Sequence, residues 1–137
     1  MVPASSEAVN RLSLRTMISS PTSRATADHY RWSTDCDGWH LVRAPELSVI
    51  EERMPPGTRE VRHSHARARQ FFYVLSGSLT MEVGDARHRL APRTGIELAP
   101  GTPHQAINES DADVEFLVIS TPPSHGDRIV AERAVDA

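Results

Sequence analysis

The sequence predicts an all-β protein, an antiparallel sandwich or barrel with a flexible N-terminal extension. Short apolar and β-branched segments are separated by Gly, Pro and Asp turns that recur about every 8–12 residues. Residues 78–83 alternate polar and apolar side chains without a break, as in a strand that buries one face. The chain has 137 residues, enough for one domain.

Three segments of different composition divide the chain. Residues 1–34 are rich in Ser, Thr, Ala and Arg and lack a regular apolar period, so we expect a flexible or partly disordered extension. Residues 35–121 hold the strand signals and form the expected barrel. Residues 122–137 form a C-terminal tail on the surface, in which 127–134 could be a short helix capped by Asp127.

The expected strands follow one another between strong turn signals. The first two are residues 38–42 and 47–54, and Pro55-Pro56-Gly57 forms the next turn. Ser76-Gly77 and Gly84-Asp85 are the turns on either side of the alternating strand. The other expected strands are residues 70–75, 87–90, 96–99, 105–108 and 114–120.

The strand at 70–75 has two apolar faces. Gln70, Phe72 and Val74 share the inner face, because side chains in a strand alternate between its two sides. The outer face carries an apolar stripe, Phe71, Tyr73 and Leu75. Such a stripe suggests a homodimer that packs sheet against sheet. Cover by the N-terminal segment, with Trp32 and Trp39, is the alternative.

Composition excludes several classes of protein. The net charge of −3 gives no electrostatic basis for nucleic acid as the main partner. Cys36 is the single cysteine, which rules out a disulfide within the chain and a cysteine-based metal site. No apolar run is longer than residues 71–75, so we expect no membrane span. We therefore expect a cytoplasmic protein with Cys36 as a small core residue.

The histidines carry the chemical signal. His63 and His65 are two residues apart, so on a strand both imidazoles face the same side. Two imidazoles on one face can bind a metal ion, although the pair alone is a weak signal. His104 follows the rigid turn at 99–103 and could supply a third nitrogen to the same ion.

The spacing of these residues resembles the two motifs of the cupin family. The first motif, G-x5-H-x-H-x(3,4)-E-x6-G, matches Gly57, His63, His65 and Gly77, with Gln70 where the family has glutamate. The second, G-x5-P-x-G-x2-H-x3-N, matches the residues Gly101, His104 and Asn108, but has Arg93 at its first glycine and Ala99 at its proline. The resemblance covers about residues 39–120.

This resemblance implies a double-stranded jelly-roll β-barrel with one divalent metal ion inside one end. The implied ligands are His63, His65 and His104, with Gln70 at the fourth position, and Asn108 has a structural role. Iron(II) is the favoured ion, and manganese, nickel or zinc would also accept this ligand set.

The glutamine affects the charge of the predicted site. An amide is neutral where glutamate is an anion, so a divalent ion keeps about two positive charges and attracts an anionic, metal-chelating substrate. Arg67 and Arg69 are expected at the mouth of the barrel, where they would strengthen this attraction. Phe72 and Met81 are expected as walls of the substrate pocket.

Three functions remain open. The first is a dioxygenase, in which iron on three histidines leaves positions for substrate and oxygen. The second is a metal-dependent isomerase or lyase of a sugar or keto acid, with Glu51 or Glu52 as a possible base. The third is a non-catalytic binding or sensing module. The fold does not decide among them.

Overall fold

The computed structural model describes residues 19–132, and its regular elements there are β-strands. They are β1 (Asp28–Trp32), β2 (Cys36–Arg43), β3 (Ser48–Met54), β4 (His63–His65), β5 (Arg69–Ser76), β6 (Leu79–Val83), β7 (Ala86–Leu90), β8 (Gly95–Leu98), β9 (His104–Ile107), β10 (Val114–Thr121) and β11 (Arg128–Val130). This described part contains no helix that could serve as a membrane-spanning segment.

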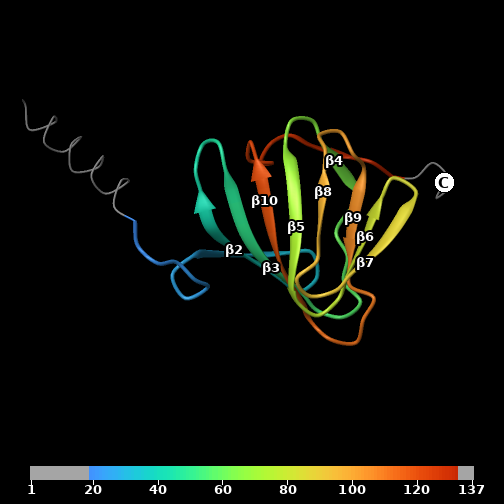
Figure 1. Cartoon of the computed structure of the whole chain (residues 1–137), viewed down its shortest axis with the longest axis horizontal. Coiled ribbons are helices and arrows are strands. Elements are labelled where there is room, and N and C mark those ends of the chain that lie inside the picture. The colour runs from blue at the N-terminus through green and yellow to red at the C-terminus, as the bar shows by residue number, and fades with distance from the viewer. Residues whose placement is uncertain (1–18, 133–137) are drawn as a thin grey trace, which may run out of the picture.

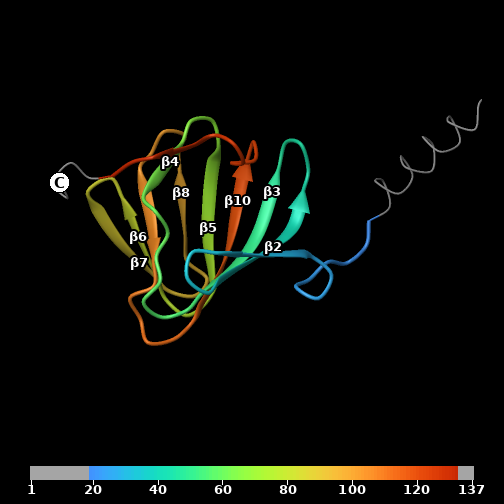
Figure 2. The ribbon, with the colours of Figure 1, turned by 180° about the vertical axis from the view of Figure 1, so that it is seen from behind.

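The strands form two antiparallel sheets that face each other (Figures 1 and 2). The larger sheet has the order β1-β2-β3-β10-β5-β8, and the smaller has the order β11-β4-β9-β6-β7. The strands β3-β10-β5-β8 and β4-β9-β6-β7 make up the eight-stranded jelly roll that the sequence predicted. Every strand pair found in the described chain lies within one sheet, so the barrel is a two-layer sandwich.

Alternating side chains on β5 and β10 build the core between the sheets. On β5, Phe72 and Val74 are buried while Phe71 and Leu75 are exposed, as predicted. β10 lies between β3 and β5 and buries every second side chain, among them Phe116. Burial of these large apolar side chains is the main stabilising contribution. Each side chain that is moved out of water stabilises the folded state by about 1.5–3 kcal/mol. Cys36 is part of this core, as expected.

The sheets extend beyond the expected limits of 35–121 at both ends. β1 (Asp28–Trp32) pairs with β2, although residues 28–34 were assigned to the extension. Its side chains are mostly exposed, so the sequence shows no buried face there. The signal for this hairpin is the polar turn after Trp32, where Ser33 and Asp35 have positive φ angles. Residues 1–18 of the expected extension lie outside the described part.

The helix that was expected at residues 127–134 is absent from residues 127–132, the part of this range that the structure describes. Residues 128–130 form β11, which pairs with β4, and residues 133–134 lie outside the described part. All three side chains of β11 are exposed, so no apolar pattern marks this strand. It forms because β4 would otherwise be an edge strand with unpaired backbone groups. After β10 the chain crosses from the larger sheet to the smaller one to reach this position (Figures 1 and 2).

Candidate metal centre

The structure brings the three predicted histidines together. His63 and His65 lie on β4, and His104 lies opposite His63 on the neighbouring strand β9. One ring nitrogen from each residue lies within 4.8 Å of the others, and all three side chains are buried. The turn before His104 is joined to β4, because the backbone N–H of Gly101 donates to the carbonyl of His65 at 2.7 Å. The turn therefore determines where His104 lies relative to the pair.

Hydrogen bonds orient all three imidazoles in the same way. In each ring Nδ1–H has an acceptor: the carbonyl of Val61 for His63 (2.6 Å), Asp127 Oδ1 for His65 (2.8 Å) and the carbonyl of Thr102 for His104 (2.9 Å). A neutral imidazole that donates through Nδ1 keeps its lone pair on Nε2. Each ring therefore offers Nε2 as a metal ligand, the arrangement that outer hydrogen bonds produce in protein metal sites.

The protonation state of the site also suits a cation. Burial lowers the pKa of His63 to about 3 and that of His104 to about 4, so both rings are neutral near pH 7. His104 Nε2 is buried and has no hydrogen-bond partner within residues 19–132. A buried acceptor without a partner is costly, and a metal ion would remove that cost. The residues present therefore fit a divalent ion.

Gln70 approaches the same site from the opposite sheet. Its side chain is buried on β5, and its Nε2 donates to Ser120 Oγ at 3.1 Å. This bond orients the amide and leaves Oε1 buried, without a partner in the described chain. A carbonyl oxygen in this position can complete the ligand set that the sequence predicted.

Asp127 contacts the candidate site, although the sequence predicted it only as a helix cap. Its Oδ1 accepts from His65 Nδ1, and its Oδ2 accepts from the backbone N–H groups of Arg67 and Ala68, both at 2.9 Å. Burial raises the pKa of this carboxyl group, but the hydrogen bonds outweigh burial and lower the pKa overall. Asp127 thus stays ionised, holds the His65 ring and closes the loop that follows it. An acidic residue after Gly126 is a weak signal, because only the tertiary structure places it beside β4.

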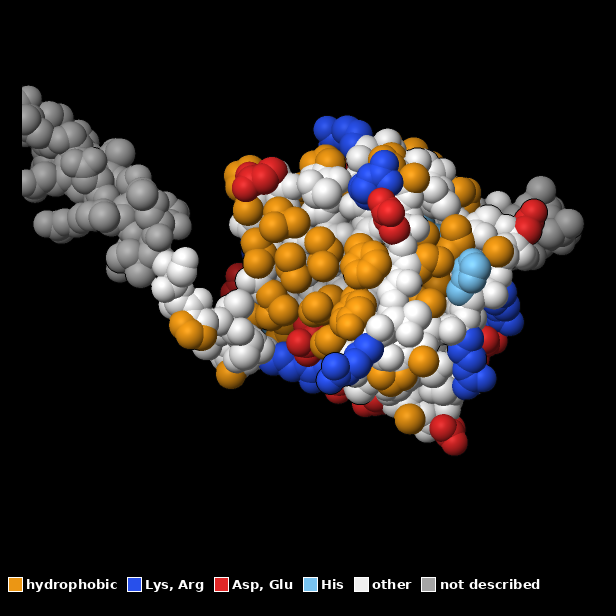
Figure 3. Space-filling view, viewed as in Figure 1, with side chains coloured by type: hydrophobic (Ala, Val, Ile, Leu, Met, Phe, Trp, Pro, Cys, Tyr) orange, Lys and Arg blue, Asp and Glu red, His pale blue; other side chains and the backbone are white. Residues whose placement is uncertain are grey.

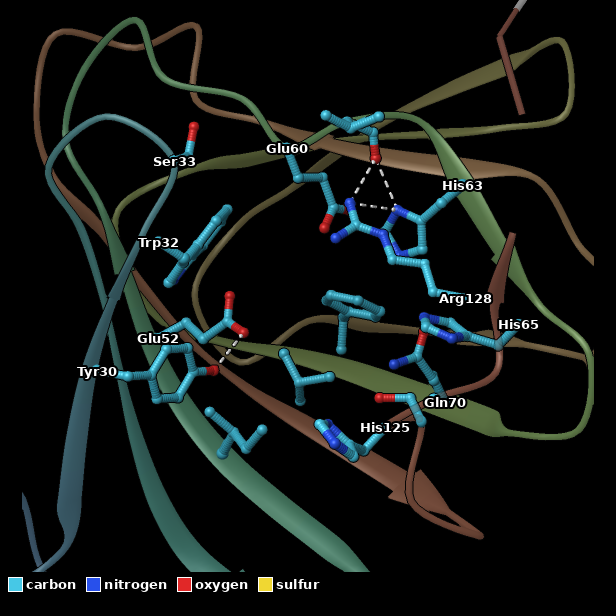
Figure 4. Close-up of a pocket in the computed structure, with 16 residues that line it drawn as sticks. Tyr30, Trp32, Ser33, Glu52, Glu60, His63, His65, Gln70, His125 and Arg128 are labelled. Atoms are coloured by element: carbon cyan, nitrogen blue, oxygen red, sulfur yellow. Dashed lines mark hydrogen bonds between the residues drawn. The ribbon is translucent and has the colours of Figure 1, made fainter. Parts of the chain in front are cut away.

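His63 and His65 lie at one side of a cavity of about 400 Å³, whereas His104 is not among its lining residues (Figure 4). This volume is in the range of small-molecule sites. His63, His65, Gln70 and Arg128 are gathered on one side of the view, and Tyr30, Trp32 and Glu52 lie across from them. Arg128 donates to the carbonyl of Val61 at 3.3 Å, so its guanidinium lies beside His63.

Two carboxyl groups also line this cavity. Burial, together with the charge of Glu60, raises the pKa of Glu52 to about 8, and burial raises the pKa of Glu60 to about 7. Tyr30 donates to Glu52 at 3.4 Å, and Glu60 accepts from the backbone N–H of Ala106 at 2.9 Å. Both side chains are half-buried, and both can hold a proton near neutral pH. The sequence analysis named Glu52 as a possible base and did not consider Glu60.

The predicted substrate residues have mixed positions. Phe72 lines the cavity. Met81 is fully buried in the core and does not line it. Arg67 is exposed, and Arg69 forms an exposed ion pair with Glu97 at 2.8 Å. Neither arginine lines the cavity, because Arg69 falls on the outer face of β5 and Asp127 holds the Arg67 backbone against the barrel. Among the described residues, the arginine that lines the cavity is Arg128, whose side chain is also exposed to solvent.

Two residues at motif positions have a structural role in the backbone. Asn108 is fully buried, and its Nδ2 donates to the carbonyls of Met54 and Ala112, both at 2.8 Å. This agrees with the structural role that was expected for it. Arg93, at the motif's first glycine, has a φ of 65°, which is the left-handed region that favours glycine. The backbone shape of the motif is therefore kept although the residue differs.

Known proteins similar to this chain have several named activities. The chain is 32% identical over 84 residues to H2HPP isomerase of Bacillus subtilis, covering 61% of this chain and 35% of that protein. It is 36% identical over 84 residues to an oxidoreductase of Arthrobotrys oligospora, covering 58% of this chain and 30% of that protein. The matches thus span about a third of each of these relatives.

Solved structures share the fold. The polyketide cyclase RemF from Streptomyces resistomycificus superposes with a TM-score of 0.72 at 19% identity, over 85% of this chain and 89% of that one. The family model described as "Cupin domain" matches residues 50–120, which hold His63, His65, Gln70 and His104. More than half of the sequence is matched, and the chain belongs to the cupin family.

Proposed function

We propose that the chain uses a divalent cation and two cavity carboxyl groups to move a proton on a small anionic oxo or hydroxy acid, as an isomerase or lyase does. The observation that supports this most is that Glu52 and Glu60 line the same cavity as His63 and His65. Proton transfer is most efficient when the pKa of the acid or base lies near the working pH. The pKa values of about 8 and about 7 meet this condition.

Each cavity residue then has a role. The Arg128 guanidinium attracts the carboxylate of the substrate into the cavity. Glu60 has the lower pKa and, as its carboxylate, takes the proton from the carbon next to the substrate carbonyl. Glu52 has the higher pKa and returns a proton from its carboxyl oxygen to a neighbouring atom. When bound, the cation is a Lewis acid that polarises the carbonyl.

The first test concerns the two carboxyl groups. Glu60→Gln should lower the rate of solvent deuterium exchange, next to the carbonyl of 2-oxo acids, by about 10²–10⁴-fold, because the amide cannot accept a proton. Glu52→Gln should lower the rate of net turnover by a similar factor. Both variants should bind Zn(II) with the same affinity as the wild type. Exchange is followed by NMR in D2O without oxygen. Glu97→Gln, an exposed substitution, is the matched control.

A dioxygenase is the second candidate. It is supported by the ligand set itself, since three imidazoles and an amide leave positions for substrate and oxygen. Turnover without oxygen under Mn(II), Ni(II) or Zn(II) supports the isomerase or lyase, whereas oxygen uptake only with Fe(II) supports the dioxygenase. Binding of an oxo acid without turnover under any of these metals would leave a binding or sensing module.

The outer face of the larger sheet is the proposed dimer interface (Figure 3). The apolar side chains that share this face through cross-strand pairing are Trp39, Val49, Phe71, Tyr73, Leu117 and Ile119. Among the described N-terminal residues, Arg24 covers one edge of this face, where its guanidinium lies 4.1 Å from the Trp39 ring centre. The rest of this face is a contiguous apolar patch that a second copy would remove from water.

The dimer can be tested by placing a charge in the patch. Phe71, 38% exposed, can be changed without affecting the core. We expect the wild type to have twice the 15.1 kDa mass of the chain in light scattering, and Phe71→Glu to be a monomer, because the carboxylate would be buried without a partner. Ile129→Glu, at an exposed apolar residue on the other sheet, should remain a dimer. A monomeric wild type would contradict the proposal.

The buried thiol also suggests a location. Cys36 is fully buried in the core and is the single cysteine of the chain. Free thiols persist where the redox conditions are reducing. We therefore propose the cytoplasm as the place where the protein acts.

A further inference from the structure

A second cavity adjoins the candidate metal pocket. It has a volume of about 580 Å³ and shares four lining residues with the first cavity: Tyr30, Ile50, Ser124 and His125. Figure 4 shows Tyr30 and His125 on the side of the metal pocket that lies away from Glu60. A molecule that extends past Tyr30 would therefore have one end in each cavity.

The two cavities differ in charge. The metal pocket contains the carboxyl groups of Glu52 and Glu60, whereas no acidic residue lines the second cavity. The second cavity instead has three basic side chains, His40, Arg43 and His125. They come from two segments far apart in sequence, the end of β2 and the loop after β10. The fold thus places one guanidinium and two imidazoles on this side, without carboxylates among the lining residues.

Two of these side chains have capacity for a ligand. His40 Nδ1 is buried and has no hydrogen-bond partner in the part of the chain described here. Arg43 has an ion pair with Asp28 at 3.5 Å, but both side chains are mostly exposed. Exposed ion pairs are weak, so Arg43 can turn to an anion at little cost. Burial, followed by the charge of Arg43, lowers the pKa of His40, so the ring would bind an anion as a neutral hydrogen-bond donor.

We propose that the second cavity is a subsite for a carboxylate or phosphate group at the far end of the substrate. Arg43 and His40 would bind the anionic oxygens, and Ile50 and Pro123 would contact the hydrocarbon part of the molecule. The substrate class is then a molecule with two anionic ends, one of which enters the metal pocket. This reading of the substrate depends on the proposed function, whereas anion binding by the second cavity does not.

The test is a titration of the full-length chain without added metal, so that the anion cannot bind as a metal ligand. Inorganic phosphate and succinate are the two probes, and the ring signals of His40 and His125 are followed by NMR. We expect saturable shifts with at least one probe, and the stronger probe identifies the anionic group. Arg43→Gln should weaken binding about tenfold or more, since the charge-assisted hydrogen bond to the anion is lost.

Arg67→Gln is the matched control, because Arg67 is exposed and lines neither cavity. It should bind both probes as the wild type does. Shifts that fail to saturate, or equal weakening in Arg43→Gln and Arg67→Gln, would overturn the subsite. The outcome is independent of the Glu60→Gln test, so the failure of either proposal can be recognised separately.

Discussion

Replacing His104 with alanine should abolish tight binding of a divalent cation. The variant removes one of three candidate Nε2 ligands, on a buried ring whose Nε2 has no hydrogen-bond partner among the described residues. The loss should exceed the roughly 10–100-fold that removal of an outer hydrogen-bond partner costs. Binding of Zn(II) and Mn(II) is measured by isothermal titration calorimetry, with metal content by elemental analysis.

Thermal stability gives a second readout of the same variant. A ligand that binds only the folded state stabilises it by about 2.7 kcal/mol at a hundred times its Kd, so metal should raise the Tm of the wild type. His104→Ala should lack this rise. His104→Leu keeps most of the buried volume beside Phe72, which separates loss of a ligand from loss of packing. The control is His88→Ala, since His88 is exposed on β7.

The outcome is unambiguous for the metal centre. If both His104 variants take up metal like the wild type and show the same rise in Tm, the three histidines do not form the binding site. The proposed isomerase or lyase would then lose its Lewis acid. The subsite for the anion would be unaffected, because neither His40 nor Arg43 contacts the three histidines.

Replacing Asp127 with asparagine should lower metal affinity by about 10–100-fold. Asp127 accepts the Nδ1 proton of His65, and such a carboxylate fixes the tautomer and raises the basicity of the ligand. Asparagine keeps the shape and one acceptor oxygen but removes the charge, so the chain should fold. Calorimetric titration with Zn(II) gives the affinity, and Asp85→Asn, in an exposed turn, is the control.

Asp127→Ala should affect stability as well. It leaves the backbone N–H groups of Arg67 and Ala68 without their acceptor. Each orphaned buried donor costs about 1–3 kcal/mol, so the free energy of unfolding should fall by about 2 kcal/mol or more. Denaturant unfolding without metal measures this loss. Metal affinity equal to wild type in both variants would mean that Asp127 has only a structural role in the loop.

Much of the fold could be predicted because strands leave local signals. The alternation of buried and exposed residues on β5 and β10 matches the pleat of a strand, and the turns at Gly57, Gly77 and Gly101 have positive φ angles that glycine permits. β1 and β11 were missed because neither buries a regular face. They are held by backbone pairing with β2 and β4, which no side-chain pattern records.

The candidate site was likewise predicted only in part, and the predicted part is the one that local sequence patterns specify. The spacing of His63 and His65, and the turn before His104, identified the three imidazoles and placed Gln70 on the inner face. The basic residues were assigned by nearness in sequence to the ligands. Arg67 and Arg69, which were expected at the mouth of the barrel, do not line the cavity, because Arg69 faces outward and Arg67 is in an exposed loop.

The sequence by itself thus determined the sandwich, its main strands and the residues that converge on the metal centre, because these depend on periods and turns within a few residues. Only the tertiary structure decided which groups surround that centre. Asp127 is 62 residues from His65, and Arg128 reaches the cavity only because β11 pairs with β4. The pKa of Glu60 is raised by burial in the folded chain, and that of Glu52 by burial and by the nearby charge of Glu60. Such effects depend on distance in space, which the local order of residues does not specify.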